Sequence, residues 1–189
     1  MNHHSRRDSS HLQSVRITLC AMIIALSLVL MLTSSLLQVM VYISPLFCGL
    51  LLIPVHLFFG VPTACLTYLA TSILVVLLGM DKEMALFYVF IGYYPLIRWK
   101  MDRLGGKPVR FCLKLMFFAL SVGCMYLILI FLLGLDSILL EFRESGVLMT
   151  ILFFLGMLVC LMAYDRLLPI LTLRYVTKLE PRLRKALRL

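Results

Sequence analysis

The chain has 189 residues, of which 62% are hydrophobic and 14% are charged, and its mean hydropathy is +1.04. A soluble domain carries roughly 25% charged residues, whereas residues 17–80 here contain no Asp, Glu, Lys or Arg. That stretch is about three times as long as the ~20 apolar residues that one helix needs to cross a bilayer. Because apolar spans recur along the rest of the sequence, the composition excludes a soluble protein behind a signal peptide and predicts a polytopic membrane protein.

The placement of the net charge of +9 argues against a nucleic-acid-binding surface. Basic residues gather in residues 1–16, in residues 98–114 and after Arg166, with apolar spans between them. This is the distribution of the positive-inside rule and not a single basic face, so no nucleic acid partner is expected. The six cysteines have no CxxC spacing and mostly fall in apolar runs. They are interpreted as small buried hydrophobic residues, not as disulfides or metal ligands.

The first helix is expected over residues 15–37, after a polar segment, residues 1–14, that is expected to be a flexible cytoplasmic tail. Ala21 and Ala25 lie four residues apart in this helix, so they share one face. Two small side chains on one face let another helix approach closely in lipid. Since alanine is also a good helix former, the pair alone leaves both interpretations open.

Two further helices are expected over residues 42–59 and 62–78, separated by a turn at residues 60–62 that contains Gly60 and Pro62. Pro54 lies inside the second helix and should kink it. His56 is either a functional group at membrane depth or a solvated histidine beside the turn. Threonines recur every four residues in the third helix and indicate helix packing: Thr63, Thr67 and Thr71.

The charged residues Asp81, Lys82 and Glu83 directly precede fourteen uncharged residues. Asp81 is placed to cap a fourth helix, with Glu83 as a favourable acid in its first turn. The same charges could also form a lid over a ligand pocket. Tyr88 lies further along, where an aromatic ring with a polar tip suits either a ligand cavity or the interfacial belt. Pro95 predicts a kink near the cytoplasmic end of this helix.

A basic loop over residues 98–114 leads into a fifth helix over residues 109–135. The following loop, residues 136–145, has three acids, including Asp136, and one arginine. It is expected outside the membrane and includes a segment that suits a short surface helix. A sixth helix is expected over residues 146–168. Residues 171–189 combine a basic face with an apolar face, which predicts an amphipathic helix on cytoplasmic membrane lipids.

Six spans place both termini and the basic loop in the cytoplasm and the acidic loops outside. Five spans would place the C-terminal basic cluster outside, against the charge bias. The predicted fold is therefore an all-α polytopic membrane protein, a bundle of six transmembrane helices over residues 15–170.

Motifs for catalysis are missing from the sequence, which has no Walker A, HExxH or GxSxG pattern. No metal site and no cofactor are expected. Asp165 and Arg166 are expected to neutralise each other at the cytoplasmic interface, and no ionisable residue is expected to be buried mid-span, which argues against an ion-coupled pump. No set of polar residues fills the roles that catalysis needs, so an enzyme is not expected. A binding and transport subunit and a structural scaffold remain.

The order of these features resembles the substrate-binding S component of energy-coupling factor (ECF) transporters. A basic start leads into VRITLCAMIIALSLVLM, which holds Ala21 and Ala25 in an AxxxA arrangement. A proline-containing loop with Ile43, Ser44 and Pro45 follows, within six spans in about 190 residues. The segment DKEMALFYVFIGYYPLIR is also similar to one in small bacterial membrane proteins of this general type. The resemblance covers residues 15–170 in pattern.

The resemblance implies a bacterial plasma-membrane protein with a ligand pocket on the outer side. Ala21 and Ala25 would contact a membrane coupling subunit driven by two cytoplasmic ATPases. The outer half lacks the histidine cluster of a nickel or cobalt S component, so the implied ligand is a small organic micronutrient, a vitamin or a precursor. The residues that the resemblance makes candidates for ligand binding are Gln38, Asp81, Lys82, Glu83, Tyr88 and Asp136.

A scaffold is the alternative, because cell-shape proteins of the MreD type have a similar length and number of spans. Such a protein would use the same helix faces for partner proteins and would enclose no ligand pocket. Under the transport hypothesis, the loop at residues 81–83 closes over the bound ligand, and ATP hydrolysis in the partners drives its release inside. Such closure requires different ligand affinities in the open and closed states.

Overall fold

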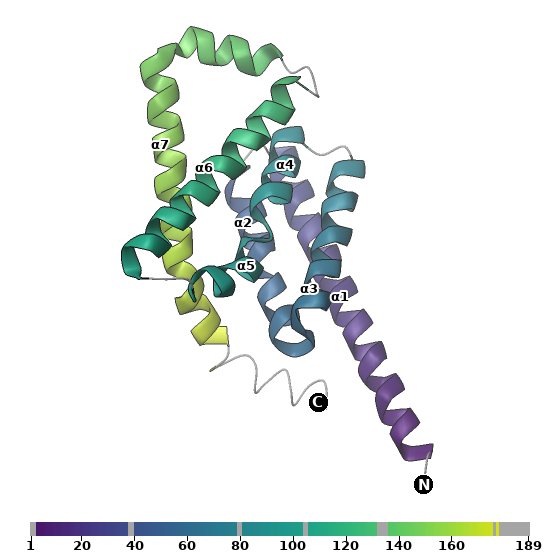
Figure 1. Cartoon of the computed structure of the whole chain (residues 1–189). Helices are drawn as coiled ribbons and strands as arrows, with labels where there is room; N and C mark the ends of the chain where they lie inside the picture. Colours follow the sequence, from purple (N-terminus) through teal and green to yellow (C-terminus); the bar gives the residue numbers. More distant parts are fainter. Residues whose placement is uncertain are drawn as a thin grey trace.

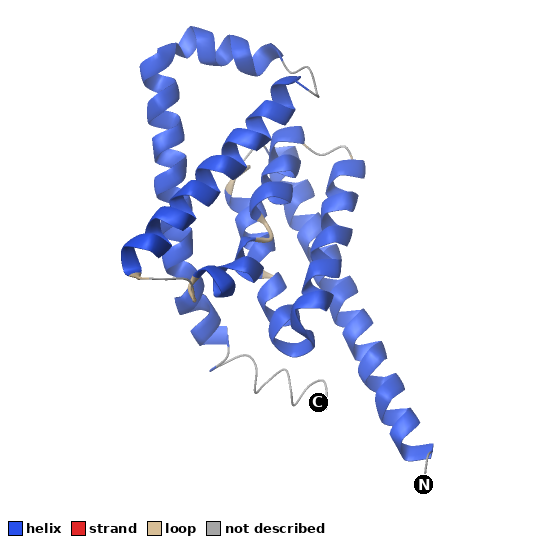
Figure 2. Cartoon of the chain, in the orientation of Figure 1, coloured by secondary structure: helices blue, strands red, loops and turns tan. Residues whose placement is uncertain are grey.

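The computed structural model describes residues 3–37, 40–78, 81–103, 106–131, 136–175 and 177, with the side chains of 3–12, 107, 136–145 and 147 left aside. Every regular element within these residues is a helix (Figures 1 and 2). The helices are α1 (His3–Leu37), α2 (Ile43–Leu50), α3 (Leu52–Leu77), α4 (Lys82–Ile91), α5 (Tyr94–Met101), α6 (Lys107–Phe131) and α7 (Asp136–Arg174).

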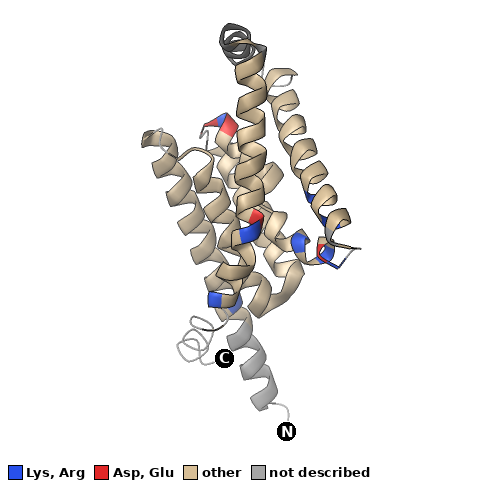
Figure 3. Ribbon diagram, turned by 90° about the vertical axis from the view of Figure 1, so that its left-hand side faces the viewer, with Lys and Arg blue, Asp and Glu red and all other residues tan. Residues whose placement is uncertain are grey.

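Four of the described helices are long and apolar enough to cross a membrane: Gln13–Leu37, Leu52–Leu77, Pro108–Phe131 and Leu148–Arg174. They expose large apolar side chains to the surroundings, as at Leu36 (81% exposed), Phe131 (83%) and Leu148 (81%). Figure 3 shows charged residues at only a few places along the ribbon. Water disfavours so much exposed apolar surface, so the surface suits a chain that lies in lipid.

The turn expected at residues 60–62 is confirmed. Gly60 interrupts α3 with φ 82° and ψ 176°, a backbone conformation that glycine adopts readily because it has no Cβ. Figure 1 shows the ribbon turning back at this end of α3. The second half of α3 then runs beside α1, with the threonine stripe on its buried side. Each of these hydroxyls donates to the carbonyl four residues earlier (2.9–3.1 Å), so the packing interpretation of the stripe is confirmed.

The other two expected spans are each built from two short helices. Residues 43–59 consist of α2 and the first part of α3, which meet at Leu51. The kink expected inside a helix at Pro54 is wrong: the break lies at Leu51, and Pro54 falls in the first turn of α3, where a missing N–H leaves no hydrogen bond unmade. The break expected near Pro95 is confirmed, since α4 ends at Ile91 and α5 begins at Tyr94. A count of six crossings stays a prediction.

The two broken spans touch each other at glycines. A Cβ atom on Gly49 in α2 would lie 3.1 Å from the carbonyl oxygen of Gly92 and 3.2 Å from the Tyr164 hydroxyl. A side chain at this position would therefore push the backbones of α2 and the α4–α5 break slightly apart, and glycine allows their close approach. Figure 1 places α2, α4 and α5 in the middle of the molecule, between α1 and α3 on one side and α6 and α7 on the other.

Buried apolar side chains form three clusters among the described residues, and two of the clusters include α4. The larger joins α4, α5, α6 and α7 through residues such as Phe87, Phe118 and Leu161. The smaller joins α1, α2, α3 and α4 and contains Met31 and Tyr88. Together they hold α4 against both sides of the bundle, which places its first turn and its far end in fixed surroundings.

The two ends of the chain extend beyond the expected spans. The backbone of residues 3–14, expected in a flexible tail, continues α1 without a break. At the other end, α7 begins at Asp136, bends at Gly146 (φ 79°, ψ 157°) and continues to Arg174. The helix before this bend coincides with the expected surface helix in residues 136–145. Most of the basic amphipathic helix expected over residues 171–189 lies outside the described residues.

Candidate functional site

The first turn of α4 is organised by Asp81, which caps the helix as expected. Its carboxylate accepts the backbone N–H groups of Glu83 (2.9 Å) and Met84 (3.4 Å). Its own backbone N–H donates to the Ser35 hydroxyl of α1 (3.2 Å). The cap ties the start of α4 to α1 and leaves the Glu83 side chain as the carboxylate that faces the bundle.

Glu83 forms the centre of a small polar cluster with two tyrosines. The Tyr42 and Tyr126 hydroxyls each donate to Glu83 Oε1 at 2.6 Å, and the two hydroxyl oxygens are 3.5 Å apart. Tyr42 precedes α2 and Tyr126 comes from α6, 41 and 43 residues away from Glu83 in the sequence. The fold therefore brings three distant segments to one carboxylate, and we call these three residues the Glu83 cluster.

Aromatic rings hold the two tyrosines of the Glu83 cluster in place. The Tyr42 ring packs edge-on against Phe87 of α4 and Phe153 of α7, with ring centroids 5.4 and 6.3 Å apart. The Tyr126 ring packs in the same way against Phe154 of α7, at 5.3 Å. Such pairs favour fixed ring orientations, so both hydroxyls are aimed at Glu83 by packing against rings of α4 and α7.

The Glu83 carboxylate has one oxygen atom, Oε2, that could accept a further hydrogen bond. Both tyrosine donors use Oε1, and no hydrogen bond to Oε2 and no ion pair to Glu83 is found among the described residues. A hydrogen bond that involves a charged group is roughly twice as strong as one between neutral groups. The half-buried carboxylate therefore suits a ligand that carries an N–H donor or a cationic nitrogen.

The other residues predicted to bind ligand are not gathered at Glu83. Lys82 is exposed. Tyr88 is fully buried in the cluster between α1, α2, α3 and α4, where its ring packs against Tyr68 at 5.7 Å. Gln38 lies outside the described residues, and the Asp136 side chain is not described. Of the six candidates, Asp81 and Glu83 are therefore the two that the structure brings together.

The proposed partner face of α1 lies on the surface. Ala21 and Ala25 are both exposed, and Ala21 borders a groove of about 500 Å³ between α1 and α3 that also contacts Thr67. A small exposed face of this kind allows a second helix to come close. The contact with a coupling subunit itself stays a prediction.

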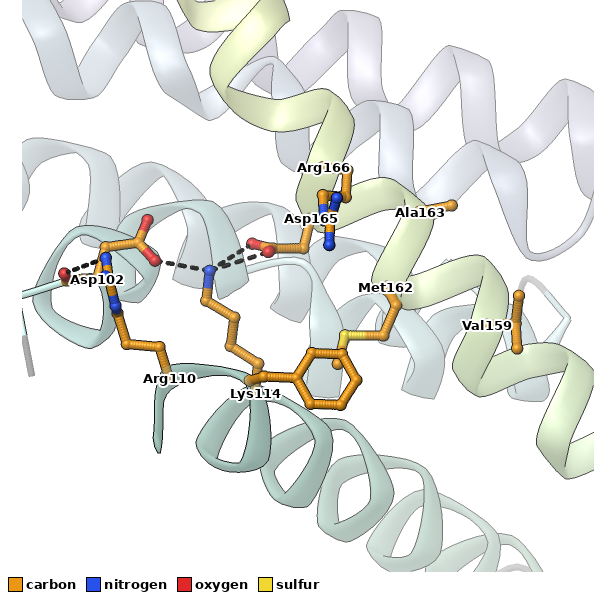
Figure 4. Close-up of a pocket in the computed structure, with 9 residues that line it drawn as sticks. Asp102, Arg110, Lys114, Val159, Met162, Ala163, Asp165 and Arg166 are labelled. Carbon is orange, nitrogen blue, oxygen red and sulfur yellow. Dashed lines mark hydrogen bonds and ion pairs between the residues drawn. The ribbon is translucent and has the colours of Figure 1, made fainter. Parts of the chain in front are cut away.

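A second polar cluster was missed by the sequence analysis. Asp165 of α7 accepts hydrogen bonds from Arg98 Nε (2.6 Å), the Tyr94 hydroxyl (2.6 Å) and Lys114 Nζ (2.9 Å to Oδ2). Lys114 also pairs with Asp102 at 2.6 Å, and Arg98 pairs with Asp102 at 3.2 Å. We call these five residues the Asp165 network; Figure 4 shows Lys114 between the two carboxylates.

One expectation about charge is wrong at the Asp165 network. Asp165 pairs with Arg98 and Lys114 and not with its neighbour Arg166, because adjacent residues on a helix point in different directions; Arg166 is exposed, whereas Asp165 is 8% exposed. Lys114, in the first third of α6, is only 6% exposed, and its burial was not expected. A signal existed: Lys114 continues the buried face of α6, which recurs every three or four residues through Phe118 and Val122.

The Asp165 network lies far along the bundle from the Glu83 cluster. In Figure 1 the start of α4 and the end of α6 lie in the upper part of the molecule, and α5 and the start of α6 lie clearly lower, at about mid-height. His56 of α3 packs edge-on against Trp99 of α5, with ring centroids 6.5 Å apart. Among the described residues no group of three or more His, Cys, Asp or Glu could hold a metal ion.

No family model matches this chain, and no curated protein or solved structure matches it either. Inferences about function therefore rest on the chemistry of the two polar clusters and on their positions in the bundle.

Proposed function

We propose that the protein is a non-enzymatic, membrane-embedded substrate-binding subunit of the ECF type, which captures a small organic micronutrient at the Glu83 cluster. The observation that carries the proposal is the half-buried Glu83 carboxylate, held by two tyrosine hydroxyls from distant segments. Ionisable groups at membrane depth are costly and usually serve function. In contrast with the Asp165 network, Glu83 has no basic partner among the described residues.

The position of the Glu83 cluster supports a pocket that opens outward. The helix α5 and the start of α6, which carry Arg98, Lys100 and Arg110, lie well below α4's first turn in Figure 1. Under the positive-inside rule the basic end faces the cytoplasm, which turns Glu83 to the outside. A substrate-binding subunit of an importer needs its ligand site on that side.

The broken helices give further support. Membrane transport proteins build substrate sites from discontinuous helices, whose ends point backbone dipoles at the ligand. Here α4 is a ten-residue helix that starts at the Glu83 cluster and ends at the break before α5. Irregular backbone of this kind is tolerated at membrane depth where it is enclosed by protein or lines a cavity.

The proposed mechanism involves no covalent chemistry. A donor nitrogen of the ligand binds Glu83 Oε2, and the capped first turn of α4, residues 81–83, closes over it, which requires tighter binding in the closed state than in the open state. Energy for the release of the ligand comes from a membrane coupling subunit with two cytoplasmic ATPases. Ala21 and Ala25 are the contact points for that coupling subunit on α1.

The test is to purify the tagged full-length protein from native membranes in mild detergent and to identify co-purifying proteins by mass spectrometry. A coupling subunit with ATPases is the expected result, and the double variant Ala21→Leu, Ala25→Leu should lose it. Ala119→Leu adds the same bulk to an exposed position of α6 and should retain it. Recovery of cell-wall or shape-determining proteins in place of ATPases would overturn the proposal in favour of an MreD-like scaffold.

A further inference from the structure

A cavity lies beside the Asp165 network, between α6 and α7. Its volume is about 530 Å³, and Figure 4 shows most of its lining. The polar lining consists of Asp102, Arg110, Lys114, Asp165 and Arg166, and the apolar lining of Phe111, Val159, Met162 and Ala163. This cavity is far from the Glu83 cluster and plays no part in the proposed function.

The charges around the cavity do not balance. Both carboxylates are already paired, Asp165 with Arg98 and Lys114, and Asp102 with the same two cations. Arg110 and Arg166 find no acidic partner among the described residues. Four cations and two carboxylates leave a local net charge of +2, and the two unpaired arginines both line the cavity.

Arg110 is poised for a further acceptor. One of its terminal nitrogens donates to the Asp102 backbone carbonyl at 3.2 Å. Its Nε atom is buried and has no hydrogen-bond partner among the described residues. An unsatisfied buried donor on a charged group costs free energy, and the planar guanidinium fork matches the geometry of a phosphate. A phosphate in the cavity would satisfy this donor and neutralise the excess charge.

The apolar wall continues from the charged end toward the middle of the spans. Val159 lies seven residues before Arg166 on α7, about 10 Å along a helix axis. Val159 is 63% exposed and Phe111 of α6 is 51% exposed, so this wall is open on the outer surface of two helices long enough to cross the membrane. The cavity therefore has a cationic end and an apolar end in the order in which a phospholipid presents its headgroup and its acyl chains.

We infer that this cavity binds an anionic phospholipid, with Arg110 and Arg166 holding the headgroup phosphate and an acyl chain lying along Phe111, Val159 and Met162. A soluble phosphate ester shares the phosphate chemistry but gains nothing from the apolar wall. Basic pockets between membrane helices on the cytoplasmic side bind anionic lipid headgroups in this way. The Asp165 network keeps Lys114 beside the site and fixes α6 and α7 on either side of it.

Native mass spectrometry of the full-length protein in detergent tests the inference, with phosphatidylglycerol and phosphatidylcholine of identical acyl chains as probes. We expect phosphatidylglycerol to bind about tenfold more tightly, and the double variant Arg110→Gln, Arg166→Gln to lose that preference, because each basic contact contributes to anionic lipid binding. Lys100→Gln, Arg103→Gln removes two exposed charges outside the cavity lining and should keep it. Ala163→Trp fills the cavity without changing charge and should also weaken binding.

Three results would overturn the inference. Equal binding of the two lipids, or an equal loss in the Lys100, Arg103 control, would reduce the effect to the general attraction of basic residues for anionic surfaces. Competition by glycerol phosphate as strong as that by phosphatidylglycerol would assign the site to a soluble phosphate ester. Melting temperatures of all variants in the same detergent separate loss of lipid from loss of folding.

Discussion

The Glu83 cluster and the Asp165 network both place a carboxylate inside the helical bundle, but they treat its charge differently. Asp165 is held by two cations and a tyrosine hydroxyl, and its exposed neighbour Arg166 does not pair with it. Glu83 is held by two neutral tyrosines that use one oxygen. A carboxylate with basic partners holds helices together. A carboxylate without a basic partner can instead bind a ligand that carries a cationic or N–H group. The comparison assigns stability to one cluster and ligand binding to the other.

The largest effect is expected from Asp165→Asn, which tests the structural role of the paired carboxylate. Arg98 and Lys114 would then share a single acid, Asp102, in a buried place. Removing one partner of a buried ion pair costs about 3–5 kcal/mol, and this loss should appear in the free energy of unfolding measured by SDS titration in detergent micelles. Asp102→Asn is the matched control: its side chain is 34% exposed, so its loss should be clearly smaller. Equal losses would show that burial does not separate the two carboxylates.

Gly49→Ala should lower the free energy of unfolding by an intermediate amount. It affects the contact between α2 and the α4–α5 break. The new Cβ would lie 3.1 Å from the Gly92 carbonyl oxygen, and overpacking of this kind costs about 1–3 kcal/mol. The same unfolding measurement applies. Gly123→Ala in α6 meets no atom within 4 Å and should leave stability unchanged or raise it. A Gly49→Ala protein as stable as the wild type would mean that α2 and α4 can move apart freely.

Tyr42→Phe should cost about 1.5 kcal/mol, the low end for a hydrogen bond to a charged group, because Glu83 keeps the Tyr126 donor. Its main effect should be a weaker hold on any bound ligand, since Glu83 loses one of the two donors that orient it. Tyr164→Phe is the control because it removes a hydroxyl that donates to the Leu46 carbonyl at 3.1 Å, away from Glu83. If both variants lowered ligand retention equally, the Glu83 cluster would have no special role.

The membrane class and most helix positions could be predicted from the sequence, because hydropathy and turn residues act locally. Local residue types explain three features: the turn at Gly60, the cap at Asp81 and the break near Pro95. The break at Leu51 could not be predicted in the same way, since no glycine or proline occupies that position and the close packing at Gly49 depends on a segment over forty residues away.

The polar clusters could be predicted only in part from the sequence. Glu83 could be named as a candidate because it belongs to three consecutive charged residues, 81–83, directly before an apolar span, and because the resemblance to S components implied a ligand site there. Its tyrosine partners could not, since their separations of 41 and 43 residues are set by tertiary packing. The pairing of Asp165 with Lys114, 51 residues apart, was missed for the same reason, and the adjacent Arg166 suggested a simpler local pair. The face on which each charge lies, and not its neighbour in the sequence, decides its partner.

The most direct test of the difference between the two clusters is the amount of small molecule extracted per mole of protein from wild type, Glu83→Gln and Asp102→Asn purified from the same membranes. Glutamine keeps an oxygen that accepts from the tyrosines, so Glu83→Gln should fold with nearly wild-type stability. We expect one metabolite with a donor nitrogen to accompany the wild type and Asp102→Asn and to be missing from Glu83→Gln. The same metabolite in equal amounts in all three proteins, or none in the wild type, would contradict ligand binding at Glu83.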